Sequence, residues 1–493
     1  MARIISGTHR GPKKRIYNHI PCNRPAVRDW IAHLALPGNM GGNSAILLWQ
    51  SAFRSLVPFW TLCQSAWNPT VARVCLLEDT HMQQRPDLPT LPAAEFLADM
   101  DLEHMIGSFS TAKGGKAVPP WSSPKTIWRL AIALPPFFWL FREFLVCCYS
   151  TLSIPLMWSI SWGVIVEKYN NKPKCHGYRV LHLLDPVSKI WIASLWSRAQ
   201  KQFAPLSYGY IPHRQREFAV LQLRVARWRA LQRNIGVLAE FWDMTNAFPS
   251  TEFALLDRTV DSAAQNEYDA WFLKSRHRRA ATIIKDSTEE VVVLRLLSGD
   301  RQGDIAAPHK FILSFDPIIE SWADSTCTAL DDMHFEYINP FTGRNHNVAV
   351  VRFADDVARL GVVLNSAGAH QIHKYWNQQL DVHIAIAGIA QNPGKRQLLV
   401  EWHGRNARHN TWQFYQSLAD DPSVSKYISS AKHLGLWHEL RYSSRAEIDA
   451  RLKAANQSWC LYRRFWITPG TNLKARINVF RAVIITTLLS GLQ

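Results

Sequence analysis

The chain is short of acidic residues. Its 493 residues include 39 Asp and Glu against 56 Lys and Arg, a formal net charge of +17 at pH 7. Such a surplus favours an acidic partner, most commonly a polyphosphate backbone, although a lipid surface would also attract it. Only 19% of the residues are charged and 47% are hydrophobic, which excludes a disordered tail for most of the chain. The length allows several subdomains around a substantial core.

Cysteines with metal-binding spacing are also missing. The eight cysteines include no Cys-x-x-Cys pair and no Cys/His knuckle, so we expect free thiols in a reducing compartment and no structural zinc. No internal repeat or low-complexity tract stands out. The basic cluster from Pro12 to Arg15 is either a nuclear-import patch or a solvated surface. We therefore expect an intracellular, nuclear protein.

One long apolar run, from Leu130 to Val166, needs a separate interpretation. Pro135, Pro136 and Pro155 break it, and Arg142 and Glu143 would lie inside any membrane span centred on the run. A buried helix is therefore favoured over a membrane span. The first residues also lack the apolar core of a secretory signal. We expect no membrane partner.

Two neighbouring carboxylates, Asp355 and Asp356, separate two apolar runs between Val350 and Leu360. This pattern predicts a β-hairpin with both acids at its turn. Adjacent carboxylates repel each other, so a divalent metal would stabilise them, whereas a solvated turn is the ordinary alternative. A third acid, Asp243, ends another short apolar run that begins at Val237.

Between these acids lies a glycine-containing turn from Ser298 to Pro308. It opens a segment whose apolar residues recur at helical spacing: Phe311, Phe315, Ile318, Ile319 and Trp322. The three elements in this order resemble the palm of a nucleic-acid polymerase.

The sequence resembles the reverse transcriptases of non-LTR retrotransposons and group II introns. Asp243 with Ala247 and Phe248 resembles their first palm motif, Arg301–Asp304 the second and Phe353–Asp356 the third. The resemblance implies an α+β right-hand polymerase with fingers, a ferredoxin-like palm and the start of an α-helical thumb.

The resemblance covers residues 107–493, which would form the reverse transcriptase domain. It implies fingers over 107–235, a palm over 236–437 and the start of a thumb over 438–493, while residues 1–106 have no known role. Flanking segments carry the match: 113–117, 155–184, 209–214, 388–395 and 432–437. Residues 473–489 resemble the helix that follows the palm, and a further C-terminal part is expected because relatives continue there.

In this family, carboxylates hold two metal ions that catalyse the attack of a primer 3′-hydroxyl on a nucleoside triphosphate. The resemblance implies that Asp243 and Asp355 bridge two Mg²⁺ ions, with Mn²⁺ as an alternative, and that Asp356 tunes the site. Lys395 would protonate or screen the leaving pyrophosphate, or else is a solvated turn lysine.

Further residues would select the nucleotide. Phe248 would lie under the sugar and exclude a 2′-hydroxyl; its alternative is a core phenylalanine. Gln302 and Gly303 would approach the nascent base pair, although Ile305 replaces the family's usual proline. Arg179 and Lys168 would clamp the β- and γ-phosphates, unless they are ordinary surface cations.

Between Pro212 and Asn234, apolar residues recur at steps of three and four, which predicts a helix that buries them and offers its arginines to a nucleic-acid backbone. The apolar set is Phe218, Leu221, Val225, Trp228 and Ile235. The candidate phosphate-contacting residues are Arg214, Arg216, Arg224, Arg227, Arg229 and Arg233, with Lys274, Arg276, Arg278 and Arg279 further on. A solvated helix face is the alternative.

Three functions stay open. The first is an RNA-directed DNA polymerase of retroelement origin, a nucleotidyltransferase that uses an RNA template, a DNA or RNA primer and dNTPs. The second is an RNA-directed RNA polymerase, disfavoured by Phe248 and by Phe-Ala-Asp-Asp in place of Gly-Asp-Asp. The third is a decayed or host-adopted nucleic-acid-binding protein. No endonuclease, RNase H or protease motif is recognisable, and the oligomeric state is open.

Overall fold

The computed structural model describes residues 105, 107–109, 116–167, 178–285, 291–419, 426–427, 429–440 and 444–489. The predictions for Pro12–Arg15, for residues 113–115, for Lys168 and for nearly all of residues 1–106 lie outside these ranges. The described chain mixes helices and sheets, in agreement with an α+β class.

A five-stranded sheet forms the centre of the molecule, in the order β13-β12-β3-β10-β9. Its strands are β3 (Gly236–Trp242), β9 (Val350–Phe353), β10 (Asp356–Val363), β12 (Gln397–Glu401) and β13 (Lys426–Tyr427). In sequence, α15 (Ala307–Ser325) lies between β3 and β9, and α17 (Ser366–Ala385) between β10 and β12. The four longer strands pair antiparallel in the spatial order 4-1-3-2. This is the strand–helix–strand–strand–helix–strand connectivity of a ferredoxin-like fold.

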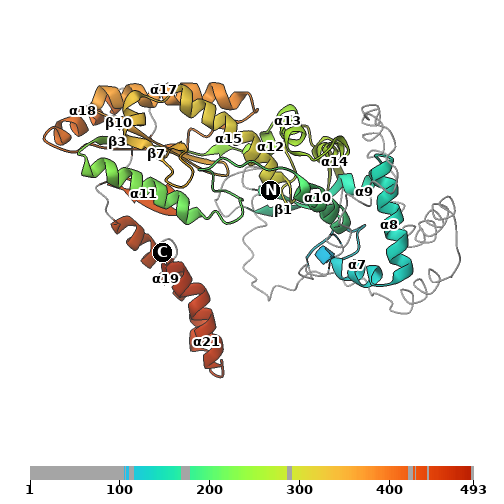
Figure 1. Cartoon of the computed structure of the whole chain (residues 1–493). Helices are drawn as coiled ribbons and strands as arrows, with labels where there is room; N and C mark the ends of the chain where they lie inside the picture. The colour runs from blue at the N-terminus through green and yellow to red at the C-terminus, as the bar shows by residue number, and fades with distance from the viewer. Residues whose placement is uncertain are drawn as a thin grey trace.

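Strand β3 is buried along its whole length because both faces of the sheet are covered. Leu238 and Trp242 pack in the cluster with α15 and α17, whereas Val237, Ala239 and Phe241 pack in the cluster with α11 (Arg216–Gln232). Figure 1 shows α15 and α17 on one side of the sheet and α11 on the other. Burial on both faces explains why β3 is apolar apart from the buried Glu240.

Helix α11 packs against the sheet through the face opposite to the one that its large apolar residues predict. Three alanines and one leucine pack against the sheet, namely Ala219, Ala226, Ala230 and Leu223. The large ones are exposed, with Phe218 at 48%, Leu221 at 56%, Val225 at 44% and Trp228 at 52%. Only Ile235, just beyond the helix, is partly buried as predicted. The alanines let the helix approach the sheet closely.

A second sheet has the order β2-β1-β5-β6 and joins two distant parts of the chain. It comprises β1 (Ile160–Glu167), β2 (Tyr178–Leu183), β5 (Ala281–Lys285) and β6 (Val291–Arg295). The last two strands come from the range that the sequence assigned to a palm. The predicted boundary at residue 235 therefore does not separate the two sheets.

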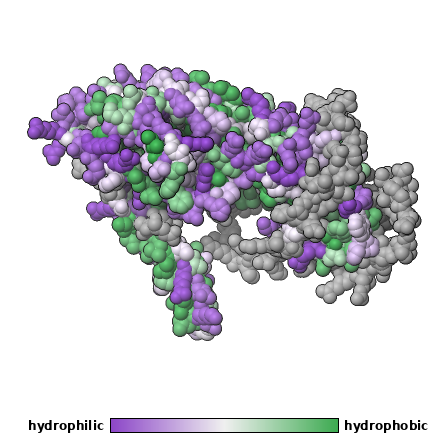
Figure 2. Space-filling view, in the orientation of Figure 1, coloured by the Kyte–Doolittle hydropathy of each residue, from purple (hydrophilic) through white to green (hydrophobic). Residues whose placement is uncertain are grey.

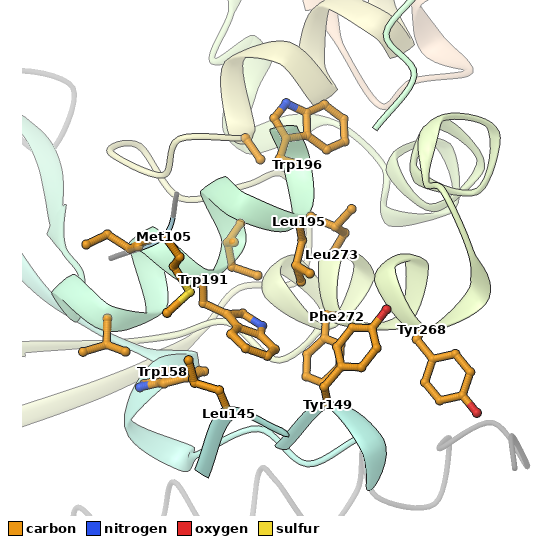
Figure 3. Close-up of a cluster of buried hydrophobic side chains, with 14 of the residues drawn as sticks. Met105, Leu145, Tyr149, Trp158, Trp191, Leu195, Trp196, Tyr268, Phe272 and Leu273 are labelled. Carbon is orange, nitrogen blue, oxygen red and sulfur yellow. The ribbon is translucent and has the colours of Figure 1, made fainter. Parts of the chain in front are cut away.

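The helices beside the second sheet share an aromatic core (Figure 3). Tyr149 of α8 (Pro135–Ser150) stacks on Phe272 with ring centroids 5.5 Å apart, and Trp191 meets Phe272 edge-on at 5.5 Å. Trp191 lies on α10 (Pro186–Arg198) and Phe272 on α14 (Glu267–Arg278). This core fixes α8, α10 and α14 as one unit.

The apolar run from Leu130 to Val166 is divided among several elements: the end of α7 (Lys125–Ile132), α8, α9 (Leu156–Ser159) and most of β1. Among the described residues, no single helix is long and apolar enough to cross a membrane. Helices α7 and α8 pass that test only as a pair, by length and composition, and they are bent by 108°.

The C-terminal part forms a helical arm that extends away from the central sheet (Figure 1). The segment 432–437 lies in a hairpin of β14 (Ser430–His433) and β15 (Leu436–Glu439), which turns at Leu434 and Gly435, where φ is positive. The arm comprises α19 (Arg445–Leu461), α20 (Arg463–Ile467), α21 (Leu473–Val479), a π-helix over Phe480–Ile485 and α22 (Thr486–Leu489). The helix expected over 473–489 is thus interrupted by a π-helical turn. Figure 2 shows hydrophobic residues along this arm.

The other named elements are short helices and strands around the two sheets. They are α12 (Ala247–Ser250), α13 (Phe253–Ala263), α16 (Ala329–Phe335), α18 (Ala407–Ala419), β4 (Met244–Thr245), β7 (Glu336–Ile338), β8 (Asn345–Asn347) and β11 (Ala390–Gln391).

Candidate active site

Three carboxylates meet at one end of the central sheet. Asp243 directly follows β3, and Asp355 lies at the turn between β9 and β10, as the sequence predicted, whereas Asp356 is the first residue of β10 and pairs with Phe353. Val357 pairs with Trp242 across β10 and β3, so Asp356 and Asp243 end neighbouring strands. A positive φ of 57° at Ala354 closes the turn.

The surroundings disfavour full charge on the acid pair. Burial raises the pKa of Asp355, and the charge of Asp243 raises it further. Burial, then the charges of Asp355 and Asp243, raise the pKa of Asp356 to about 7. A cation among the three carboxylates would relieve this repulsion.

One cation already contacts the cluster. Lys395 Nζ donates to Asp243 Oδ1 at 2.8 Å and to Oδ2 at 2.9 Å, although its side chain is 51% exposed. Asn392 also holds Asp243, because its Nδ2 donates to Oδ2 at 3.1 Å and its backbone N–H donates to the Asp243 carbonyl at 2.9 Å. The sequence singled out Lys395 for the leaving group but gave Asn392 no role.

The residues present suit Mg²⁺ or Mn²⁺ in kind, since both ions prefer carboxylate oxygens. Within the described ranges, however, no three His, Cys, Asp or Glu side chains are arranged to hold a metal ion. Lys395 contacts both Asp243 oxygens, so a metal that uses Asp243 has to replace this ammonium.

A loop packs directly against the acidic turn. The Tyr208 N–H donates to the Arg352 carbonyl at 2.9 Å. A Cβ placed on Gly209 would lie 2.2 Å from the Ala354 nitrogen, so only glycine fits at this close approach. The segment 209–214 therefore fixes the turn that carries Asp355.

Phe248, on α12, is held between two rings. It stacks on Phe311 with centroids 4.2 Å apart, and Tyr210 meets it edge-on at 6.0 Å. The side chain is half-buried at the edge of the core that contains α15. Its position is compatible with both a core role and a wall of a nucleotide site.

The turn from Ser298 to Pro308 lies against the second sheet. The His182 N–H donates to the Gln302 carbonyl at 3.3 Å, and a Cβ on Gly303, where φ is +112°, would lie 3.0 Å from the His182 carbonyl oxygen. Arg301 is fully buried and donates to the carbonyls of Ser159 at 2.8 Å and Arg276 at 3.0 Å. The backbone at Gln302 and Gly303 is thus fixed by β2, while Arg301 is structural.

Two predicted phosphate contacts are wrong because the arginines are buried. Arg276 is 4% exposed, forms an ion pair with Asp304 and donates to the Trp158 carbonyl at 2.8 Å. Arg227 is also 4% exposed and donates to Glu401 at 2.6 Å. Neither guanidinium can reach a phosphate backbone without breaking a buried ion pair.

The other candidate arginines are more accessible, but most have protein partners. Arg214 donates to the Ser207 carbonyl at 2.8 Å, Arg216 pairs with Glu217 at 2.9 Å, and Arg278 donates to Asp257 at 2.8 Å.

The remaining members of the predicted phosphate-contacting set are also placed by the structure. Arg224, Arg229 and Arg279 are half-buried, and burial lowers the pKa of Arg279. Lys274 pairs with Asp261 at 2.6 Å. Arg233 is exposed at the end of α11, where it contacts His334 Nδ1 at 3.1 Å.

Arg179 lies on the exposed part of β2, and its charge lowers the pKa of Asp355.

Comparisons with known proteins find similarity among solved structures. No protein-family profile and no curated protein matches the chain. Among solved structures, apo telomerase from Candida tropicalis truncated from its C-terminal domain is similar at 11% identity and a TM-score of 0.35, covering 57% of this chain and 56% of that one. A second apo telomerase structure from Candida tropicalis has 8% identity and a TM-score of 0.38, covering 57% of this chain and 47% of that one. The match thus spans about half the length of each telomerase chain and assigns no family.

Proposed function

We propose that this protein is a nucleotidyltransferase, an RNA-directed DNA polymerase of retroelement origin. The observation that carries the proposal is the meeting of Asp243, Asp355 and Asp356 beside Lys395, at one end of a sheet with ferredoxin-like connectivity. In this proposal the five-stranded sheet is the palm, the four-stranded sheet belongs to the fingers and the helical arm begins the thumb.

The chemistry would be phosphoryl transfer from a dNTP to a primer 3′-hydroxyl. Asp243 and Asp355, assisted by Asp356, would hold two Mg²⁺ or Mn²⁺ ions, which activate the hydroxyl and stabilise the leaving pyrophosphate when bound. Lys395, once released from Asp243, would be free to donate a proton or positive charge to the pyrophosphate. Its 51% exposure allows this movement.

Selection of dNTPs would rest on Phe248. The ring cannot retreat from a ribose because Phe311 stacks beneath it at 4.2 Å. A 2′-hydroxyl at this ring would therefore be excluded by contact. Gln302 and Gly303 would bound the base pair, and Arg179 with Lys168 would bind the triphosphate.

An RNA template and a DNA or RNA primer would complete the complex. Near the end of α11, the half-buried Arg229 follows the exposed ring of Trp228 in the sequence, and Arg233 is exposed just beyond the helix. Cations interleaved with aromatic rings suit a nucleic-acid strand, because the cations contact phosphates and the rings stack on bases.

One observation favours a second candidate, a nucleic-acid-binding protein without polymerase activity. Both oxygens of Asp243 are engaged by Lys395, so a protein that never releases this contact would keep its fold and lack the metal site.

Primer extension with matched RNA binding tests the proposal. The wild-type protein is assayed on RNA and DNA templates, with dNTPs or rNTPs and with Mg²⁺ or Mn²⁺. Extension of an RNA-templated primer with dNTPs is the expected result. Preferential use of rNTPs would instead indicate an RNA polymerase, and RNA binding without any extension would establish the non-catalytic candidate.

A further inference from the structure

Tyr210 is an exposed aromatic residue at the centre of the candidate site. Its side chain is 56% exposed, although its neighbour Ile211 is buried. Its φ of 56° lies in the left-handed region, which is uncommon for a bulky residue and costs conformational energy. The surrounding structure therefore has to hold Tyr210 in this conformation.

Contacts on both sides fix the backbone of Tyr210. Its carbonyl oxygen lies 2.8 Å from His309 Nε2 at the start of α15. On the other side, Gly209 lies against Ala354, where an added Cβ would be 2.2 Å from the backbone nitrogen. The strained residue is thus attached both to the acidic turn and to the helix that supports Phe248.

The side chain lies between the aromatic and the acidic parts of the site. Its ring meets Phe248 at an interplanar angle of 89° and a centroid distance of 6.0 Å. Burial raises the pKa of the Tyr210 phenol, Asp355 raises it next, and Arg179 lowers it. The phenol therefore interacts electrostatically with Asp355, which is proposed to bind metal, and with Arg179, which is proposed to bind triphosphate.

This position suits a tyrosine because the ring is apolar and the hydroxyl both donates and accepts hydrogen bonds. A nucleotide whose sugar lies on Phe248 and whose phosphates lie at Asp355 has to pass the Tyr210 hydroxyl. A phenylalanine would keep the contact with Phe248 but could not make this hydrogen bond.

Resting on the proposed polymerase function, we propose that Tyr210 is a nucleotide-positioning residue. Its ring fixes Phe248 from the open side, and its hydroxyl hydrogen-bonds the sugar–triphosphate part of the incoming dNTP. Two acceptors share this chemistry, the 3′-hydroxyl of the sugar and a phosphate oxygen.

Two substitutions separate the ring from the hydroxyl. Tyr210→Phe removes only the hydroxyl, and Tyr210→Leu removes both; Tyr375→Phe, on the exposed face of α17, is the matched control at 46% exposure. We expect Tyr210→Phe to raise KM for dNTPs by about tenfold with little change in kcat, the size expected for one lost hydrogen bond. Tyr210→Leu should in addition reduce discrimination against rNTPs, because Phe248 loses its edge-on neighbour.

Dideoxynucleotides identify the acceptor. If the hydroxyl contacts the sugar 3′-hydroxyl, Tyr210→Phe raises KM for dNTPs but leaves KM for ddNTPs unchanged. If it contacts a phosphate oxygen, both KM values rise together. Either result supports the proposal.

Direct binding of dATP in the presence of Mg²⁺ separates this inference from the proposed activity. If the wild-type protein binds dATP but does not extend a primer, the polymerase function fails while a weaker Kd for Tyr210→Phe still supports the positioning role. An unchanged Kd and KM for Tyr210→Phe would overturn the inference. Absence of dATP binding by the wild-type protein would overturn both.

Discussion

The hairpin of β14 and β15 should open in mild acid because of two buried histidines. His433 and His438 are 4% and 2% exposed and pack on Phe241 with ring centroids 5.0 Å and 5.4 Å away. Within the described chain, none of their four ring nitrogens has a hydrogen-bond partner. Burial lowers the pKa of His433 from 6.5 to about 3, and burial followed by the charge of His433 lowers that of His438.

The direction of the pH effect follows from these shifts. Both imidazoles stay neutral in the folded hairpin but take up protons when it opens, so stability is complete above the unfolded pKa of 6.5 and falls as the pH drops toward 3. Between pH 7.5 and pH 5.0, His433 alone should cost about 2 kcal/mol. This corresponds to a roughly 30-fold larger opening constant.

Hydrogen exchange of the hairpin amides measures this opening at pH 5.0 and pH 7.5, after correction for intrinsic exchange rates. His433→Leu should reduce the pH dependence, and His433→Leu with His438→Leu should abolish it. His409→Leu, on the exposed part of α18, is the control and should retain it. Equal opening constants at the two pH values in the wild-type protein would refute the reasoning.

Three further predictions concern the proposed activity. Phe248→Ala should admit rNTPs while retaining much of the dNTP activity, and a tenfold gain in kcat/KM for rNTPs corresponds to about 1.4 kcal/mol of relieved contact; an unchanged preference would make Phe248 a core residue only. Gly209→Ala should lower kcat for extension by about tenfold or more, because its Cβ would lie 2.2 Å from the Ala354 nitrogen and displace the acidic turn. A kcat equal to that of the wild type would contradict this packing. Neutralising Arg229 and Arg233 to Gln should flatten the slope of log RNA affinity against log salt, whereas Arg227→Gln should lower the melting temperature instead; an unchanged slope would mean that Arg229 and Arg233 do not contact phosphates.

The strands that carry the acids could be predicted from sequence. A short apolar run ending in Asp243 and two such runs around Asp355 and Asp356 are local patterns, and the structure has a strand at each. The expectation that the acids meet came from the family resemblance, because no local pattern indicates that β3 pairs with β10.

The packed face of α11 could not be predicted, because the helix carries two apolar stripes. Periodicity identifies a helix but does not decide whether the large residues around Leu221 or the small ones around Ala226 face the sheet. The alanines allow a closer approach, and Glu401 on a distant strand neutralises the buried Arg227. Similarly, nothing near Arg276 in sequence indicates its ion pair with Asp304.

Tyr210 and Asn392 were missed for a related reason. Each owes its importance to a partner far away in sequence, Phe248 and Asp243 respectively. Gly209 can be identified in the sequence, but its close approach to Ala354, which requires a glycine, depends on the fold.

The most direct test of the central claim is single-nucleotide extension by Asp355→Asn and Asp243→Asn, with RNA affinity measured on the same preparations. Each change removes a carboxylate charge at nearly constant volume, while Asp449→Asn on the exposed face of α19 serves as the matched control. We predict that the wild-type protein and Asp449→Asn extend the primer, that neither site variant does, and that all four proteins bind RNA equally. Extension by Asp355→Asn or Asp243→Asn at a rate near that of the wild type would contradict the assignment of these carboxylates as the catalytic centre.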